Sequence, residues 1–200
     1  DPVRVDLWKE EEYPKLKKRA CKHGARIYFL DETGFSSEPN LRRTYGLKGQ
    51  TPVVQTSGKR QRVNVISAVN ARGAFWCETY TCTLNQSTFI GFLKAFVASR
   101  REKVFLVLDS HPAHIAKSVK QYVQSTKGRL ELHFLPPYAP DLNPDEFVWN
   151  HLKGNGVAKK PLSKGESLKE RVQADLAQLK KDRKLIRSLF MADSVVYAAD

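Results

Sequence analysis

Two aspartates each follow directly after a short, largely apolar segment. Asp31 comes after Arg26–Leu30, and Asp109 comes after Val104–Leu108. Segments of this length and composition are typical of strands that are buried on both faces. If the two strands are parallel neighbours, both carboxylates lie at one edge of the sheet, where open α/β sheets place their sites. Adjacent carboxylates repel each other, so one must take up a proton or a cation must lie between them, and Mg²⁺ prefers such oxygen ligands.

A third acid, Glu146, closes the proline-rich segment Leu135–Glu146, LPPYAPDLNPDE. Asn143 is a suitable helix cap and Pro144 a suitable first helical residue, so Glu146 is expected in the first turn of a helix. The helix dipole stabilises an acid in this position and keeps it ionised, as a metal ligand must be. The three acids together indicate a site for divalent cations at the carboxyl edge of a sheet.

Each acid also has a simpler interpretation, which the residues leave open. Asp31 is a suitable turn residue ahead of Gly34. Asp109 is a suitable cap for a helix that begins near Pro112. Glu146 stands where a capping box would close, in which case its role is structural.

Four further polar residues lie beside the three acids. Glu32 follows Asp31 on a strand and should face the opposite side of the sheet, while Asp145 should point elsewhere on its helix than Glu146. His111 and His114 either contact a phosphate, tune Asp109, or simply form a polar helix start. Histidine as a metal ligand is disfavoured here because hard carboxylate sites suit Mg²⁺.

The pattern around these residues predicts an α/β fold with a mixed five-stranded sheet flanked by helices. The expected strands are Arg26–Leu30, Arg62–Val69, Ala74–Cys82, Val104–Leu108 and Leu130–Leu135. The turn at 70–73 indicates a hairpin, so the first three strands favour an antiparallel meander. The later strand–helix–strand units favour parallel additions through right-handed crossovers. Residues 34–60 form a long loop, with a further short strand expected at Val53–Thr56.

Helices are predicted where apolar residues follow the spacing of one helix face. Two such stripes are Phe89, Phe92, Leu93, Phe96 and Val97, and, after Pro112, Ile115, Val119, Tyr122 and Val123. A third helix should run from Asn143–Pro144 to about Lys153. The tail from Ser167 has a capping box with Glu170, and its apolar stripe is expected to pack on the core or form a dimer surface. That stripe is Leu168, Val172, Leu176 and Leu179, with Leu185, Ile186, Leu189 and Phe190 beyond.

The composition favours a polyanionic partner. The 200 residues hold 34 Lys and Arg against 21 Asp and Glu, a formal net charge of +13, which favours nucleic acid ahead of membrane. No apolar run is long enough for a transmembrane helix. The three cysteines have no Cys-x-x-Cys spacing, which disfavours a disulfide framework or a zinc ribbon and favours a reducing cytosol.

Basic side chains in and beside the long loop are the candidates for contacts with DNA phosphates. They are Arg42, Arg43, Lys48, Lys59, Arg60 and Arg62, and we add His111 and His114 near the acids. A solvated loop face explains the basic residues equally well. Tyr138 and Trp149 flank the third acid, and packing under the helix is favoured over stacking on bases.

The residues at the three acids resemble a known family. The segments Asp31–Gly34, Leu108–His114 and Leu135–Glu146, in this order and context, resemble those of the mariner-superfamily transposases, and most of all the bacterial insertion sequence 630 group. The resemblance covers roughly residues 6–200. The Asn-Pro-x-Glu segment is long and specific, whereas Asp-Glu-Thr-Gly alone is weak. The 36 residues between Asp109 and Glu146 slightly exceed the usual family spacing, which we interpret as a loop difference.

The resemblance implies a ribonuclease-H-like catalytic domain, like that of retroviral integrases, with Asp31, Asp109 and Glu146 as catalytic residues and metal ligands. Two Mg²⁺ ions, for which Mn²⁺ can substitute, would clamp a scissile phosphate. Asp31 would contact both ions, and Asp109 and Glu146 one each. The expected activity is cleavage of transposon ends and strand transfer into target DNA at TA. The expected partners are double-stranded DNA and, in the active complex, further copies of the chain as a homodimer or higher assembly.

Two alternatives remain at this stage: a ribonuclease-H-like nuclease that cuts without joining, and an inactive transposase kept as a DNA-binding module. The family normally carries helix-turn-helix modules before the catalytic domain, and the only Met is Met191, so we expect an N-terminal region to be missing. The expected organisation is a linker and short helix at 1–24, with Pro14 in its first turn and Gly24 past its end, a catalytic core at 25–155, and a C-terminal helical extension packing on that core at 156–200. The expected location is the bacterial cytoplasm, at the nucleoid.

Overall fold

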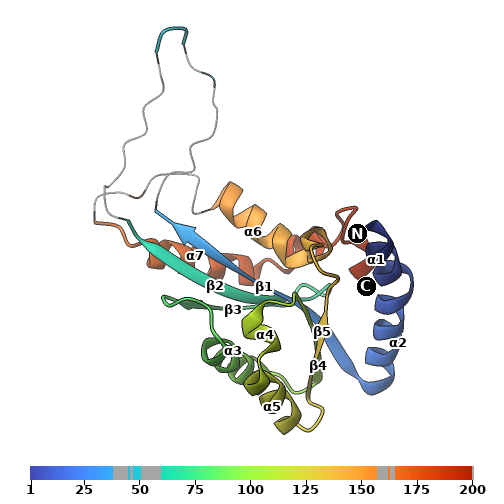
Figure 1. Ribbon diagram of the computed structural model, residues 1–200. Helices are drawn as coiled ribbons and strands as arrows, with labels where there is room; N and C mark the ends of the chain where they lie inside the picture. The colour runs from blue at the N-terminus through green and yellow to red at the C-terminus, as the bar shows by residue number, and fades with distance from the viewer. Residues whose placement is uncertain (38–44, 46, 51–59, 157–161, 163–164, 200) are drawn as a thin grey trace.

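A mixed five-stranded sheet lies at the centre of the molecule, in the order β3-β2-β1-β4-β5 (Figure 1). The computed structural model describes residues 1–37, 45, 47–50, 60–156, 162 and 165–199. The strands are β1 (Ala25–Ser36), β2 (Arg62–Val69), β3 (Phe75–Tyr80), β4 (Lys103–Leu108) and β5 (Leu130–Phe134). β1, β2 and β3 pair antiparallel, and β1, β4 and β5 pair parallel. The predicted mixed sheet, with its antiparallel meander and parallel additions, is confirmed.

β1 is longer than the sequence predicted. It continues past Asp31 to Ser36 and pairs there with Arg62 at the start of β2. Beyond Asp31 the continuous apolar run gives way to alternation, with Phe35 buried and Gly34 exposed. Such alternation is typical of a strand with one solvated face, whereas the glycine, serine, proline and arginine content predicted a loop from residue 34 onward. The expected strand at Val53–Thr56 lies outside the described residues.

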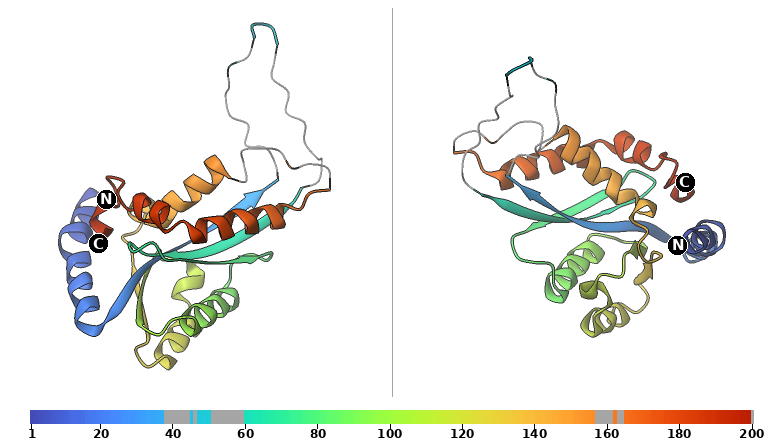
Figure 2. Two further views of the ribbon diagram at one scale, coloured as in Figure 1. Left: turned by 180° about the vertical axis from the view of Figure 1, so that it is seen from behind. Right: turned by 45° about the horizontal axis from the view of Figure 1, so that its top comes forward.

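Side chains that alternate along β1 divide the core into two layers. Phe29 and Phe35 belong to one apolar cluster, and Tyr28 and Leu30 belong to the other. The first face is covered by α6 (Pro144–Asn155), α7 (Leu168–Lys181) and α8 (Arg183–Leu189), and the second by α3 (Gln86–Ala98), α4 (Pro112–Ile115) and α5 (Lys117–Ser125), as Figures 1 and 2 show. Odd-numbered residues of β1 therefore face α6, and even-numbered residues face α3 to α5.

The helix predicted after Pro112 is divided in two. Ala116 has an extended backbone, with ψ 147°, and separates α4 from α5. Ile115 is consequently 44% exposed instead of lying on the buried face, so its place in the predicted stripe was wrong, whereas Val119 is fully buried. The break could not be predicted from the sequence, because neither a glycine nor a proline marks it and the pattern of apolar residues continues across it. The stripe of the preceding helix, α3, is buried throughout as predicted.

The short helix expected with Pro14 in its first turn and Gly24 past its end is present, but the residues before it, expected as a linker, are helical as well. α1 (Pro2–Leu7), a π-helical turn at Trp8–Glu12 and α2 (Tyr13–His23) follow one another without a break. Pro14 lacks the N–H that a continuous α-helix requires, and the chain widens into the π-helical turn just before it. Gly24, with φ 62°, ends α2 in the left-handed conformation.

The C-terminal helices form part of the layer over the sheet. α7 packs on β2 and β3 (Figure 2, left), and its four predicted stripe residues are buried in the same cluster as Phe29. At its start, the Ser167 side chain accepts a hydrogen bond from the Glu170 N–H, which is one of the two bonds of a capping box. Tyr13 lies edge-on to Tyr197, with ring centroids 4.9 Å apart, so the two ends of the chain meet. No helix among the described residues has the length and apolar character needed to cross a bilayer.

Candidate active site

The three predicted acids line one cavity of about 440 Å³. β1 and β4 are parallel neighbours whose register pairs Phe29 with Val107, so Asp31 and Asp109 stand two residues beyond that pair on their respective strands. Residues two apart on a strand share a face, so the Asp31 and Asp109 side chains lie on the same side of the sheet as Phe29 and Val107, which is the side that α6 covers. Glu146 reaches the same cavity from the first turn of α6. The predicted meeting of Asp31 and Asp109 therefore holds at the point where the β1–β4 pairing ends, although β1 itself continues to Ser36. The segment at 135–140 forms the other wall of the cavity.

The start of α6 is fixed to the sheet by Asn143. Its side-chain oxygen accepts from the Asp145 N–H at 3.1 Å, and its side-chain N–H donates to the carbonyl oxygen of Leu30 at 2.9 Å. The Asn143 backbone N–H donates to the carbonyl oxygen of Pro140, at 2.8 Å, so this donor is already satisfied without a capping box. Glu146 is thus available to the cavity, and its position is tied to the residue that precedes Asp31.

Burial raises the pKa of Asp31 well above its ordinary value, and the negative charges of Asp145, Glu146 and Glu32 raise it further. Several carboxylates in a confined, poorly solvated space cannot all remain ionised without a compensating charge. Hard oxygen ligands grouped in this way are the donor set that Mg²⁺ and Mn²⁺ prefer. The residues present therefore fit a divalent-cation site.

Asp145 lies beneath this site and was not expected there. It is fully buried, and its Oδ2 accepts a hydrogen bond from the Ser67 hydroxyl at 2.7 Å. Ser67 stands directly opposite Asp31 in the β1–β2 pair, which places Asp145 next to Asp31. Burial raises the pKa of Asp145 well above its ordinary value, despite the Ser67 hydrogen bond. Unlike Glu146, Asp145 is not among the residues that line the cavity, in agreement with the expectation that the two acids differ in direction on the helix. The sequence signal that could have located it is Ser67, a polar residue within an otherwise apolar part of β2.

Asp109 is held from the opposite side of the sheet by His114. Nδ1 of His114 lies 2.8 Å from Oδ1 of Asp109, and the His111 N–H donates to the same oxygen at 3.1 Å. The hydrogen bond from His114 is the main reason that the pKa of Asp109 lies below its ordinary value. His114 is buried, so this placement favours the tuning of Asp109 over a direct contact with DNA. Glu32, which faces away from Asp31 as predicted, approaches the other side of the His114 ring, with Oε2 3.7 Å from Nε2.

His111 both lines the cavity and begins α4. Its Nδ1 accepts a hydrogen bond from the Ala113 N–H at 3.1 Å, so His111, not Asp109, is the cap of this helix. Burial lowers the pKa of His111. Glu32, His111 and His114 also bring ligand-type atoms within 4.8 Å of one another. Because the Nδ1 atoms of both rings already hold the α4 start and Asp109, we interpret this group as support for the cavity wall.

The predicted DNA contacts remain predictions. Lys48, Arg60 and Arg62 are exposed, with Arg62 at the start of β2. Arg42, Arg43 and Lys59 lie outside the described residues. The two aromatic residues differ: Trp149 is buried and packs edge-on against Phe35, whereas Tyr138 lines the cavity fully exposed, with φ 56°. For Trp149, packing under the helix was the correct alternative.

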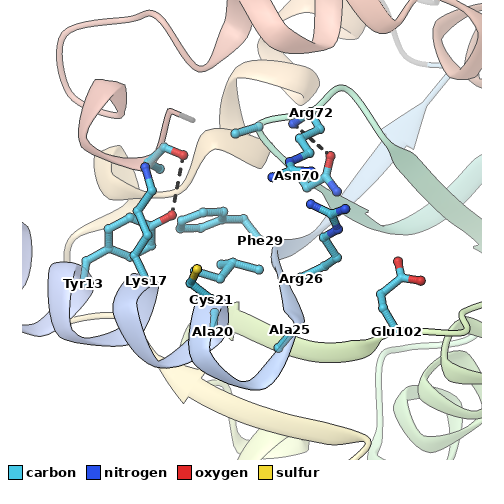
Figure 3. A pocket seen from close by; sticks show the side chains of 14 residues that line it. Tyr13, Lys17, Ala20, Cys21, Ala25, Arg26, Phe29, Asn70, Arg72 and Glu102 are labelled. Carbon is cyan, nitrogen blue, oxygen red and sulfur yellow. Dashed lines mark hydrogen bonds between the residues drawn. The ribbon is translucent and has the colours of Figure 1, made fainter.

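A second cavity, of about 530 Å³, lies at the other end of β1, between α2 and the β2–β3 turn (Figure 3). Figure 3 shows the Tyr13 hydroxyl there, donating to the carbonyl oxygen of Ala198. Glu102 is the one acid among the described residues that line this cavity, beside the basic Lys17, Arg26 and Arg72. A lone acid cannot form the paired-carboxylate site, so this cavity is not the candidate active site.

Comparison with known proteins gives a family match and a set of structural neighbours. The family model described as DDE superfamily endonuclease matches residues 26–169. The chain is similar to a chain of the Mos1 strand transfer complex, with a TM-score of 0.69, 19% identity, and coverage of 97% of this chain and 58% of that one. A Mos1 mariner paired-end complex with Mn gives a TM-score of 0.69, 20% identity, and coverage of 97% and 59%. No curated protein sequence matches.

The catalytic domain of Mos1 mariner transposase is also similar, with a TM-score of 0.59, 15% identity, and coverage of 100% of this chain and 96% of that one. The chain therefore spans about three fifths of the Mos1 chains in the two complexes and nearly all of the isolated catalytic domain. At this level of identity the likeness concerns the fold, and the expected ribonuclease-H-like fold is confirmed.

Proposed function

The chain belongs to the DDE superfamily endonucleases, and from this premise we propose that it is the catalytic domain of a DNA transposase. It would cleave transposon ends and join them to target DNA. The observation that carries the proposal is the convergence of Asp31, Asp109 and Glu146 on one cavity beside the carboxyl end of β4. The family match and the +13 net charge, which suits a polyanionic substrate, support it independently.

In this proposal Asp31, Asp109 and Glu146 would hold two Mg²⁺ ions. When bound, such ions would supply activation of the attacking oxygen and stabilisation of the leaving oxygen in an in-line phosphoryl transfer. The chain itself supplies the arrangement: Asn143 ties Glu146 to β1, and His114 ties Asp109 to α4. Mos1 paired-end complexes have been determined with Mn and with Mg, which supports Mn²⁺ as a substitute.

The finer proposals rest on the resemblance of the acid-bearing segments to the mariner superfamily. We propose double-stranded transposon ends and target DNA as the partners, TA as the target site, and the insertion sequence 630 group as the origin. A Mos1 paired-end complex with the left transposon end supports DNA ends as the partner. The active complex would contain two or more copies of the chain, acting on the nucleoid in the bacterial cytoplasm.

A strand-transfer reaction tests the proposal. The chain is mixed with a short duplex bearing a free 3′-hydroxyl, a supercoiled plasmid, and Mg²⁺ or Mn²⁺. Joined product that requires the metal and disappears with Asp109→Asn is expected. Nicking without joining would contradict the transposase and favour the nuclease that cuts only.

If neither nicking nor joining is observed, the same chain is fused to the helix-turn-helix modules of a mariner transposase. The fusion is then tested with the matching terminal repeat as substrate. An inactive fusion that still binds the repeat would contradict the proposed activity and favour a DNA-binding module.

A further inference from the structure

His114 and Glu32 form a support for Asp109 on the side of the sheet opposite the cavity. Asp109 is the most exposed of the groups in this arrangement, with 56% of its side chain accessible, whereas the His114 side chain is completely buried. An exposed carboxylate samples several rotamers, and a metal site requires one of them. The contacts that select that rotamer therefore bear directly on how well the site binds a cation.

Both hydrogen bonds to the Asp109 carboxylate end on the same oxygen. The His114 ring nitrogen and the His111 N–H lie 2.8 Å and 3.1 Å from Oδ1. An ionised carboxylate only accepts hydrogen bonds, so Nδ1 of His114 carries the proton and donates. Among the described residues no hydrogen bond reaches Oδ2, which leaves that oxygen as the ligand atom.

The His114 ring is fixed on its other sides as well. It packs on the buried Phe89 ring, with centroids 4.4 Å apart. Its Nε2 and the Oε2 of Glu32 are both buried, neither has a standard hydrogen bond, and they face each other at 3.7 Å. Because two buried acceptors repel, a proton on Nε2 or on Oε2 is required for these atoms to stabilise each other. Glu32 thereby sets the orientation of a ring that in turn sets the orientation of Asp109.

We infer that His114 is a positioning residue for Asp109, and that Glu32 acts through His114. The inference rests on the proposed metal-dependent function and deepens it, because it assigns to two residues outside the acid triad a role in cation affinity. Removing a residue that hydrogen-bonds to a metal ligand typically weakens metal binding by about 10- to 100-fold.

Two substitutions of His114 separate positioning from packing. In His114→Asn the side-chain N–H replaces Nδ1, so the link to Asp109 is kept and the link to Glu32 is lost. In His114→Gln the N–H replaces Nε2, so the link to Glu32 is kept and the link to Asp109 is lost. Both variants lose the ring contact with Phe89, so both should lower the melting temperature similarly.

The readout is Mn²⁺ binding by isothermal titration calorimetry on the metal-stripped chain without DNA. We expect His114→Gln to raise the Kd for Mn²⁺ by about tenfold or more, and His114→Asn to raise it by less than about threefold. Equal losses in both variants, in step with their melting temperatures, would overturn the inference in favour of a purely structural role. An unchanged Kd in both would also overturn it.

Glu32→Gln provides a second test that leaves the His114 ring in place. If Glu32 acts through His114, Glu32→Gln should weaken Mn²⁺ binding in the wild-type background and have no further effect in the His114→Gln background. An equal effect in both backgrounds would contradict that route. Wild-type chain that binds no Mn²⁺ would instead contradict the proposed metal chemistry itself, whereas wild-type binding with an unchanged His114→Gln variant contradicts only the positioning role.

Discussion

The Asn143 side chain donates to the carbonyl oxygen of Leu30 at 2.9 Å, and this one bond joins the start of α6 to the strand residue that precedes Asp31. Two of the three acids of the candidate site are thereby placed relative to each other by a buried amide. The same side chain caps α6, because its oxygen accepts from the Asp145 N–H. The helix start and the site geometry consequently depend on one residue.

Asn143→Ser should separate these two roles. Serine keeps a capping oxygen but cannot reach Leu30, so a buried carbonyl loses its partner at a cost of about 1–3 kcal/mol. We expect this loss in the free energy of unfolding, measured in urea, together with a fall in metal-dependent cleavage. Asn85→Ser is the matched control, since Asn85 caps α3 at an exposed position. Equal losses of stability and of cleavage in Asn143→Ser and Asn85→Ser would contradict a specific role of the Asn143–Leu30 hydrogen bond in the site.

Asp31→Asn and Asp109→Asn should each reduce metal-dependent cleavage to background. Each change removes a carboxylate ligand and a negative charge together, so DNA binding should be unchanged or tighter. Gel-shift titration of a DNA duplex in the absence of metal measures the binding, and cleavage of the same labelled duplex measures the chemistry. Cleavage at the wild-type rate in either variant would show that the acid is not a ligand.

The metal-free chain should lose stability as the pH rises. The pKa values of Asp31 and Asp145 both lie above their ordinary value of 3.8, so the folded chain retains protons that the unfolded chain releases. Their contribution to stability is complete below about pH 4 and is lost as the pH rises through the raised folded pKa values. In chelator, the melting temperature should therefore fall from about pH 5 to about pH 8.

Asparagine cannot ionise, so in Asp145→Asn the melting temperature should fall less as the pH rises. Saturating Mg²⁺ should also reduce the fall, because a cation favours the ionised form of Asp31. A melting temperature that rises over the same pH range and does not respond to Asp145→Asn would contradict the proposed crowding of carboxylates.

Tyr197→Phe should weaken the link between the C-terminal segment and the site. The Tyr197 hydroxyl donates to the carbonyl oxygen of Leu142, at 2.6 Å, in the 3₁₀ turn Pro140–Leu142 just before α6. Loss of this bond should cost about 1 kcal/mol in the free energy of unfolding. Cleavage should fall more than that change in stability alone explains, measured well below the melting temperature. Unchanged cleavage in a destabilised variant would limit Tyr197 to a structural role.

The sheet and the placement of the three acids at one cavity were predictable because their signals are local. Each of the two aspartates follows a buried apolar segment, and Asn143–Pro144 is a strong helix start, so strand periodicity and capping chemistry predicted that Asp31, Asp109 and Glu146 lie near one another. The extension of β1 to Ser36 was missed because its alternating residues fall in a segment rich in turn formers.

The supporting residues were harder to predict because their partners are distant in sequence. Asp145 meets Ser67 across the sheet, and Glu32 meets His114 from another element. Their burial depends on tertiary packing, which no local spacing encodes. The break at Ala116, which separates α4 from α5, is likewise without a sequence marker.

The most direct test of the account compares two acids of the same segment. Glu146 lines the cavity, whereas Asp141, five residues earlier, is exposed and is not among the residues that line it. Metal-dependent cleavage of a labelled terminal-repeat duplex is measured for Glu146→Gln and Asp141→Asn at matched folded fractions. We predict background cleavage with Glu146→Gln and near wild-type cleavage with Asp141→Asn. Wild-type cleavage by Glu146→Gln, with only a small loss of stability, would mean that this acid merely caps α6 and would contradict the three-acid site.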